Sequence, residues 1–293
     1  MSTEIADQPS AWTRAAKLGP TEAIHHALPE RGQRVAIIGC GTSFFMAQSF
    51  ADLRERSGHG ETDAFPASEF PTRRSYHTVV ALTRSGTTTE VLRLLGTLRN
   101  GTGPRTVVIT ADPDAPVIKL AHDHVLLDFA DEKSVVQTRF ATTSLALWRA
   151  WLGEDLTAVV RQGRSALTDP LLPRALDSAQ FAFLGSGMSV GIANEAALKL
   201  REASQSWTES YPAMEFRHGP ISVVGATSTV WVFGPPPAGL LGDLQVTGAH
   251  VENSDLDPMA DLIRAQRLAV ALAETKGLNP DEPRHLTRSV VLS

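Results

Sequence analysis

The sequence predicts an α/β fold, built on parallel sheets with helices packed on both faces. Short apolar runs of strand length alternate along the chain with longer helical segments. Several of these runs lead directly into glycine loops, which join strands to helices in such folds. The order of apolar run, glycine loop and helix then restarts near residue 181, which indicates an internal duplication of one fold.

Four runs in the first half have the composition of buried strands: 35–38, 79–82, 105–110 and 125–127. Three segments of this half have helical character: one that ends near Phe50, Glu90–Leu98, and a long one from about Val135 to Trp151. The first two helices each follow a glycine loop. This half is therefore expected to form a parallel sheet that helices cover.

The second half repeats the pattern more briefly. Phe181–Leu184 is the expected strand, Gly185–Gly187 the tight loop and Val190–Ala203 the helix. Thr229–Phe233 is a further strand, which three prolines end because proline cannot donate a backbone hydrogen bond. Before the final helix, Met259–Lys276, there is little room for more strand–helix units. The second half is therefore predicted to be the smaller one.

At 293 residues, the chain is long enough for two domains. The segment between the two patterns is polar and helical in character, so we expect it to connect them. Four parts are predicted: an N-terminal helical arm (1–33), a first α/β domain (34–152), a helical connection (153–178), and a second, shortened domain with a C-terminal tail (179–293).

Charge and composition exclude several classes of function. The net charge is −5 and the lysines and arginines form no cluster, so the chain lacks the basic surface that nucleic-acid binding needs. No apolar run approaches the length that spans a membrane, and the N-terminus has no basic-then-apolar export signal. The single cysteine, Cys40, cannot form an internal disulfide. We therefore expect a cytoplasmic globular protein.

Two hydroxyl-rich loops, Gly39–Ser43 and Thr83–Thr89, follow the first two strands. Backbone N–H groups of such loops, and the positive end of the following helix, can face an anion. Neither loop matches a nucleotide-binding motif. Serine and threonine also cap helices that bind no phosphate, which is the simpler interpretation of either loop alone. Two loops at successive strand ends meet at one crevice, however, which favours a phosphate monoester as the ligand.

A third segment supplies groups for acid–base chemistry. Glu195, Lys199 and Glu202 are spaced four and three residues apart, so they share one face of the expected helix. On an isolated helix they would form a solvated stripe of ion pairs, but the neighbouring alanines allow this helix to be buried. His218 follows in a restrained His-Gly-Pro turn, where it either presents its ring or is hydrogen-bonded within the turn. A carboxylate and an imidazole are suited to proton transfer on a small molecule.

In the order of these motifs, the chain resembles the sugar isomerase (SIS) family. The likeness is to the isomerase half of glutamine–fructose-6-phosphate amidotransferase in particular, and to related phosphosugar isomerases, deaminases and deglycases. The similarity extends over nearly the whole chain. The segments that carry it are Glu4–Pro9, Cys40–Ser43, Ala67–Phe70, Ser85–Thr88, Glu132–Thr143, Ala197–Glu202, Glu209–Pro220 and Pro283–Val290.

This resemblance implies two tandem flavodoxin-like SIS domains, the second one smaller, and a homodimer. It also implies a phosphate site on the two loops, with a third loop beside the sugar. The residues so implied are Gly41, Thr42, Ser43, Thr83, Ser85, Thr87 and Thr88 for the phosphate, and Val135, Gln137 and Thr138 for the sugar. Glu202 takes the position of the family's proton-shuttling base, and Lys199 that of a lysine close to the substrate. His218 matches a ring-opening histidine that the neighbouring subunit contributes.

The chain departs from the amidotransferase at four positions. Arg288 replaces the lysine that forms a Schiff base with the substrate, and a guanidinium that stays protonated cannot act as that nucleophile. Ser2 is not the cysteine that the glutaminase half requires, so ammonia transfer from glutamine is not expected. Arg84, which either adds charge to the phosphate loop or points to solvent, replaces a glutamine, and Gln137 replaces a serine. Both replacements indicate a changed substrate.

The sequence therefore predicts a phosphosugar isomerase-type enzyme that moves a proton between carbons 1 and 2 of a hexose 6-phosphate derivative. Glu202 is the expected base, His218 the ring-opening group, and Arg288 a fixed charge near carbon 2. The missing lysine favours an aminosugar phosphate and release of its amine, as in a deaminase or deglycase. A simple aldose–ketose isomerase and a non-catalytic sugar-phosphate sensor are the alternatives. No cofactor is expected, and the pair His122 and His124 lacks a third ligand for a metal.

Overall fold

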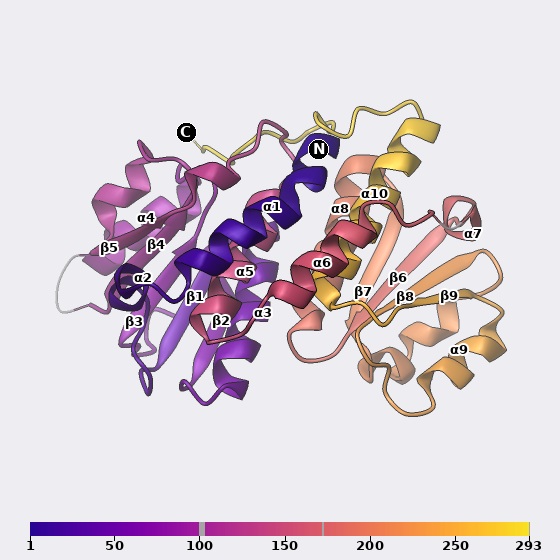
Figure 1. Cartoon of the computed structure of the whole chain (residues 1–293), viewed down its shortest axis with the longest axis horizontal. Helices are drawn as coiled ribbons and strands as arrows, with labels where there is room; N and C mark the ends of the chain where they lie inside the picture. Colours follow the sequence, from indigo (N-terminus) through magenta and orange to yellow (C-terminus); the bar gives the residue numbers. More distant parts are fainter. Residues whose placement is uncertain (100–102, 172, 293) are drawn as a thin grey trace.

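The computed structural model describes residues 1–99, 103–171 and 173–292, and it contains two parallel sheets (Figure 1). The strands are β1 (Val35–Gly39), β2 (Thr62–Pro66), β3 (Thr78–Leu82), β4 (Arg105–Thr110), β5 (Asp123–Leu126), β6 (Gln180–Gly185), β7 (Trp207–Pro212), β8 (Ser228–Phe233) and β9 (His250–Asn253). The first sheet has the order β2-β1-β3-β4-β5, and the second has the order β7-β6-β8-β9. All neighbouring strands run parallel. The predicted α/β fold with two parallel sheets is confirmed.

Three strands that the sequence did not predict, β2, β7 and β9, lie at the edges of the sheets. A parallel strand in the centre of a sheet is buried on both faces and reads as a continuous apolar run, whereas an edge strand does not. Strand β7 begins with Trp207, whose side chain is exposed, and continues with polar residues. The central strands β1, β3 and β8 are buried at every residue. Burial of the central strands explains why the sequence predicted these and missed three of the four edge strands; the fourth, β5 (Asp123–Leu126), was predicted from its short apolar run.

The helices form layers around the two sheets. Their bounds are α1 (Ser2–Leu18), α2 (Glu22–Ala27), α3 (Thr42–Arg56), α4 (Thr89–Arg99), α5 (Arg139–Trp151), α6 (Thr157–Ala166), α7 (Pro173–Leu176), α8 (Ser189–Ser204), α9 (Leu240–Thr247) and α10 (Pro258–Thr275). Figure 1 shows α1, α3, α5, α6, α8 and α10 between the sheets. Helix α4 packs on the outer face of the first sheet and α9 on that of the second. The predicted helix from Val135 begins later, at Arg139.

The two halves share one hydrophobic core, to which both sheets and the central helices contribute. Within it, α3 and α8 pack antiparallel and very close together. A Cβ atom on Gly191 of α8 would lie 2.3 Å from the backbone oxygen of Phe45 in α3, so only glycine allows this approach. The side chain of Asn194 then donates a hydrogen bond to that of Gln48 at 2.7 Å. This packing brings the C-terminal end of α8 to the loop that follows β1.

Candidate functional site

The loop after β1 turns the chain sharply into α3. Gly41 has a φ of 54°, a left-handed conformation that glycine adopts without strain. A Cβ atom on Gly39 would lie 2.5 Å from the backbone carbon of Ser43, so this position also requires glycine. Thr42 and Ser43 thus begin α3 at the carboxyl end of the sheet, where ligands of open α/β sheets bind.

Helix α8 brings a lysine and two carboxylates to this loop. The ammonium group of Lys199 donates a hydrogen bond to the hydroxyl of Thr42 at 3.0 Å and pairs with the carboxylate of Glu202. The nearer carboxyl oxygen of Glu195 lies 3.6 Å from the same nitrogen. The side chains of Lys199 and Glu195 are fully buried, whereas that of Glu202 is 20% exposed. Of the three, Glu202 is therefore the group that a ligand can reach.

Burial shapes the ionisation of this group. Burial raises the pKa of Glu195 to about 8, because the charge of Lys199 only partly offsets the loss of water around the carboxyl. Burial by itself would lower the pKa of Lys199, but Glu195 and Glu202 outweigh it and raise that pKa. Burial therefore favours the protonated form of Glu195, and Lys199 makes its closer contact with Glu202.

Glu202 opens into a pocket of about 380 Å³. One wall belongs to the end of α8 and the residues after it, including Arg201 and Gln205. The other wall is the C-terminal segment, which contributes Arg284 and His285. His285 has a φ of 64°, a left-handed conformation that is uncommon for residues other than glycine. The C-terminal segment therefore forms part of the pocket that contains Glu202.

The second hydroxyl loop follows β3 and precedes α4. The hydroxyl of Thr87 lies 3.0 Å from that of Ser85, and the backbone N–H of Thr87 donates to the same Ser85 oxygen at 3.3 Å. Thr83 and Ser85 are buried, with small exposed fractions. Gly86, with a φ of 62°, packs so closely that a Cβ atom there would lie 2.4 Å from the side chain of Ala115. The loop is thus held tightly, with the hydroxyls of Ser85 and Thr87 directed toward each other.

Arg84, within this loop, is buried and does not point to solvent. Its guanidinium donates to the backbone oxygens of Ser134 at 2.9 Å, Val135 at 3.1 Å and Arg288 at 3.1 Å. It also lies 3.7 Å from the carboxylate of Glu132. Burial lowers its pKa, and Glu132 opposes that effect. Arg84 therefore links the second hydroxyl loop to the 134–135 loop and to the C-terminal segment.

Glu132 fixes the start of α5. One of its carboxylate oxygens accepts hydrogen bonds from the backbone N–H of Thr138 at 2.7 Å, from the hydroxyl of Thr138 at 2.9 Å, and from the N–H of Arg139 at 2.6 Å. The hydroxyl of Thr138, which was expected beside the sugar, is thus buried and engaged in capping this helix. The backbone N–H of Val135 donates to the oxygen of Asp281 at 3.0 Å. The amide oxygen of Gln137 is buried without a partner among the described residues.

The side chain of Arg288 contacts the protein rather than an open site. Its guanidinium pairs with the carboxylate of Asp131 and donates to the backbone oxygen of Glu132. The side chain is 38% exposed. In this arrangement Arg288 anchors the C-terminal segment to the residues that precede α5, and its backbone oxygen accepts from Arg84.

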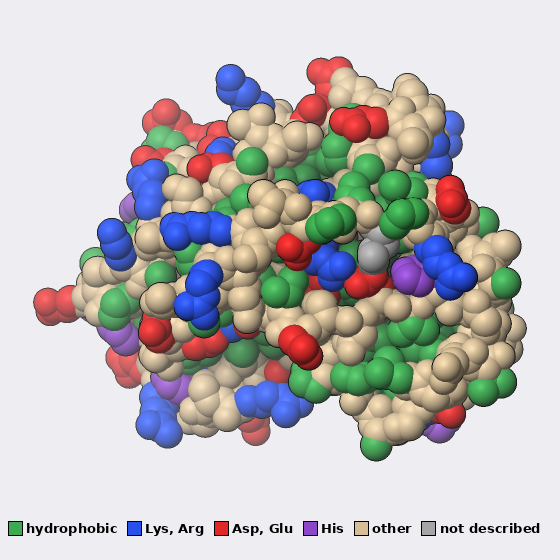
Figure 2. Space-filling view, turned by 45° about the vertical axis from the view of Figure 1, so that its right-hand side comes forward, with side chains coloured by type: hydrophobic (Ala, Val, Ile, Leu, Met, Phe, Trp, Pro, Cys, Tyr) green, Lys and Arg blue, Asp and Glu red, His purple; other side chains and the backbone are tan. Residues whose placement is uncertain are grey.

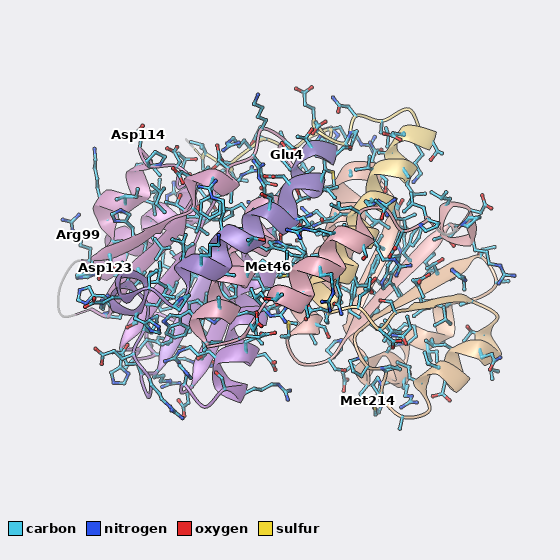
Figure 3. All side chains as sticks on the ribbon, viewed as in Figure 1. Glu4, Met46, Arg99, Asp114, Asp123 and Met214 are labelled. Atoms are coloured by element: carbon cyan, nitrogen blue, oxygen red, sulfur yellow. The ribbon has the colours of Figure 1, made fainter. Side chains whose placement is uncertain are left out.

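His218 lies at the opposite end of the second half from Glu202. It is exposed in the short 3-10 helix η4 (Glu215–His218), which follows β7 at the carboxyl end of its sheet. Helix α8 starts at that same edge, and Glu202 lies thirteen residues along it, a rise of roughly 20 Å. Figure 3 labels Met214, which directly precedes η4, at the lower edge of the second half. His218 and Glu202 therefore do not meet within one chain.

The described ranges contain no group of three histidine, cysteine or acidic side chains that would hold a metal ion. None of the helices in those ranges is both long enough and apolar enough to cross a bilayer. Figure 2 shows acidic and basic side chains interspersed over the face that it draws. On that face the positive charges are therefore not gathered into one basic surface.

Residues 30–151 match the model of the SIS domain. This part of the chain, less than half of its length, is an SIS domain. The sequence is 27% identical over 311 residues to glutamine–fructose-6-phosphate aminotransferase (isomerizing) of Campylobacter jejuni, an alignment that covers 88% of this chain and 51% of that protein. The chain thus spans about half the length of the curated relatives it matches. The predicted resemblance to the SIS family is confirmed.

Solved structures of two sugar-phosphate enzymes superpose on nearly the whole chain. Glucosamine-6-phosphate deaminase of Thermotoga maritima has a TM-score of 0.81 at 24% identity, with 99% of each chain covered. Tagatose-6-phosphate ketose/aldose isomerase of Escherichia coli has a TM-score of 0.80 at 19% identity, covering 99% of this chain and 96% of that one. At these identities, the likeness concerns the fold.

The fold brings some of the predicted residues together and separates others. Thr42, Lys199 and Glu202 form one contact group, and Ser85, Thr87 and Thr88 lie in another, beside the C-terminal segment. Sequence reasoning missed Glu132, His285 and Ser289, the last of which contacts the second hydroxyl loop. The similarity of Pro283–Val290 to the family was the available signal for His285 and Ser289, because it marks the whole segment and not only Arg288.

Proposed function

We propose that this chain is a phosphosugar isomerase-type enzyme that acts on a hexose 6-phosphate derivative. The observation that carries the proposal is the contact between Lys199 and Thr42 at 3.0 Å. Through it, a partly exposed carboxylate, Glu202, is held beside a hydroxyl-rich loop at the carboxyl end of the first sheet. A phosphate anchor next to a base is the combination that proton transfer on a sugar phosphate needs.

In this proposal, the two hydroxyl loops bind the 6-phosphate and orient the open-chain sugar. Glu202 removes the proton from carbon 2 and returns it to carbon 1, while a proton moves between the oxygens of these carbons. Lys199 orients Glu202 and balances its charge, and its own charge persists because its pKa is raised. The lysine is hydrogen-bonded and buried, so the geometry supports a positioning role rather than covalent attachment to the substrate.

We further propose that the substrate is an aminosugar phosphate that loses its amine. When carbon 2 carries nitrogen, the same proton transfer leaves an imine at carbon 2, and water hydrolyses it to a ketose and ammonia or an amine. Arg288 replaces the lysine that would form a Schiff base, and its guanidinium is paired with Asp131. The name of the Thermotoga maritima protein of the same fold, a glucosamine-6-phosphate deaminase, supports this branch.

We propose that the active unit is a homodimer in which His218 completes the site of the neighbouring subunit. The support is the separation of His218 from Glu202, roughly 20 Å along α8, which no side-chain rotation can close within one chain. Co-expression of Glu202→Gln and His218→Ala chains should give hybrid dimers with one intact site, so activity should return in the mixture. A fully active monomer in sedimentation would contradict this arrangement.

Phosphate recognition is the direct test of the proposed function. We expect Ser85→Ala with Thr88→Ala to weaken binding of glucosamine 6-phosphate on the order of 100-fold or more, because each hydrogen bond to a charged group contributes about 1.5–3 kcal/mol. Isothermal titration measures the affinity. The matched control is Thr97→Ala with Thr168→Ala, which removes two exposed hydroxyls elsewhere.

The same titration and an activity assay separate the alternatives. Ammonia release from glucosamine 6-phosphate supports the deaminase branch. Interconversion of an aldose and a ketose 6-phosphate without amine release supports a simple isomerase. Tight phosphosugar binding without turnover indicates a sensor. Equal affinity of the wild type for glucosamine and its 6-phosphate would overturn the whole proposal.

A further inference from the structure

The C-terminal segment places one of its own hydroxyls in the second hydroxyl loop. The hydroxyl of Thr87 lies 3.0 Å from that of Ser289, and the hydroxyl of Thr88 lies 3.3 Å from it. Thr87 also contacts Ser85 at 3.0 Å. Four hydroxyl groups, three from the loop and one from a segment about two hundred residues away, thus form one cluster.

The position of Ser289 is set by contacts on both sides of it. The backbone oxygen of Arg288 accepts from the buried guanidinium of Arg84 at 3.1 Å. The backbone oxygen of Val290 accepts from the N–H of Thr89 at 3.1 Å, and the N–H of Leu292 donates to the hydroxyl of Thr89 at 2.8 Å. The residues before and after Ser289 are therefore fixed to the loop and to the start of α4, and its side chain is directed into the cluster.

The four hydroxyls of this cluster have four protons to donate, but they make three contacts with one another, so at least one proton remains for a ligand. A hydroxyl has one proton, so Thr87 can donate to Ser85 or to Ser289 but not to both. A phosphate monoester brings several acceptor oxygens and no obligatory donor, so it could accept one hydrogen bond from each of the four hydroxyls. The N-terminus of α4, at Thr89, adds the positive end of a helix on the same side.

We propose that Ser289 is a phosphate-binding residue, the fourth hydroxyl of a site that Ser85, Thr87 and Thr88 begin. The inference rests on the proposed function, because it assigns a further residue to the same phosphate site. It also gives the C-terminal segment a specificity role: Ser289 discriminates a phosphorylated sugar from its unphosphorylated form.

The test measures phosphate discrimination, the ratio of the dissociation constants of glucosamine and glucosamine 6-phosphate. Ser289→Ala should lower this ratio on the order of tenfold or more, since it removes one hydrogen bond to a charged group. Ser289→Thr, which keeps the hydroxyl, should restore most of the ratio. The matched control is Thr287→Ala, which removes a hydroxyl of the same segment that donates to the backbone oxygen of Ser289 at 2.8 Å.

The outcomes separate this inference from the proposed function. If Ser85→Ala with Thr88→Ala lowers the ratio and Ser289→Ala does not, the phosphate site stands and the role of Ser289 is overturned. If Ser289→Ala and Thr287→Ala lower the ratio equally, the order of the segment matters and not the hydroxyl of Ser289, which also overturns the inference. A ratio near one in the wild type would instead remove the proposed function itself.

Discussion

The loops after β1 and after β6 have the same construction and different contents. Both need glycine: a Cβ atom on Gly185 would lie 2.1 Å from the backbone oxygen of Ser189, as one on Gly39 would crowd Ser43. In the loop after β6, the hydroxyl of Ser189 lies 3.0 Å from the N–H of Ser186 and 3.1 Å from the oxygen of Phe233. The hydroxyl of Ser43 makes no hydrogen bond with any residue that the structure describes. The loop after β6 is closed on itself, whereas the loop after β1 bonds to Lys199 through Thr42 and leaves the hydroxyl of Ser43 without a partner among the described residues.

The antiparallel packing of α3 and α8 extends this comparison to the helix ends. The C-terminal end of α8 meets the loop after β1, and the C-terminal end of α3 meets the loop after β6, where Gly187 lies beside Asp52 and Arg56. Where α8 meets the loop after β1, Lys199 is fully buried and contacts the carboxyl groups of Glu195 and Glu202. Where α3 meets the loop after β6, Arg56 pairs with Asp52 at 2.8 Å but is 70% exposed. Equivalent geometry thus gives a buried ionic group in one place and a surface ion pair in the other.

The strand–loop–helix pattern alone therefore does not make a site. A surface ion pair is screened by water and contributes little free energy. A buried lysine has fixed partners, and its charge interacts more strongly with them because water is excluded. Of these two loops, the loop after β1 is the one that combines a hydroxyl without a partner among the described residues, a buried cation and a reachable carboxylate. This difference supports the proposal that the chemistry takes place there and that the loop after β6 is a structural corner.

The largest expected effect compares the two acidic residues at these helix ends. Glu202→Gln should lower activity about 10²- to 10⁴-fold, the usual contribution of general acid–base catalysis. Asp52→Asn should leave activity close to that of the wild type, because its ion pair with Arg56 is exposed. Steady-state kinetics with glucosamine 6-phosphate measure both. Equal losses in the two variants would contradict the assignment of the chemistry to the first loop.

The second prediction compares the equivalent serines of the two loops, one expected to affect binding and the other stability. Ser43→Ala should weaken glucosamine 6-phosphate binding about 10- to 100-fold with little change in the free energy of unfolding, because its hydroxyl has no partner among the described residues. Ser189→Ala should lower the free energy of unfolding by about 1–3 kcal/mol and leave binding unchanged, because it removes hydrogen bonds of a buried corner. Titration and urea denaturation of both variants test this prediction. A loss of binding in Ser189→Ala as large as that in Ser43→Ala would contradict it.

The third prediction, whose effect at any one pH step is the smallest, is a pH dependence of stability due to Glu195. Its pKa is raised by burial to about 8 from an ordinary value of 4.5, so between these pH values the folded chain holds a proton that the unfolded chain has lost. This contribution to stability is complete below pH 4.5 and is lost as the pH rises through 8, with a slope of at most about 1.4 kcal/mol per pH unit. Glu195→Gln should flatten the slope between pH 5 and 8 relative to the wild type. Urea denaturation at several pH values measures it, with Glu22→Gln on exposed α2 as the control. An unchanged slope in Glu195→Gln would show that Glu195 does not carry this proton.

The fold class and the candidate loops were predictable from the sequence alone. Central parallel strands are apolar throughout, and the glycines of the tight turns are visible as such, so β1, β3, β6 and β8 were predictable. The spacing of Glu195, Lys199 and Glu202 likewise follows from helical periodicity alone. Local rules of this kind need no knowledge of what packs against the element.

Which side chains contact one another depends on the tertiary structure. Helix packing brought Lys199 to Thr42, 157 residues away in sequence, and separated Glu202 from His218, which are near each other in the chain. The burial of Arg84 and the contact of Ser289 with Thr87 depend on where the C-terminal segment lies. Periodicity describes one element at a time, whereas partners, burial and the pKa values that burial shifts are set by elements distant in sequence. For that physical reason, the residues of the site were predictable singly but not as an arrangement.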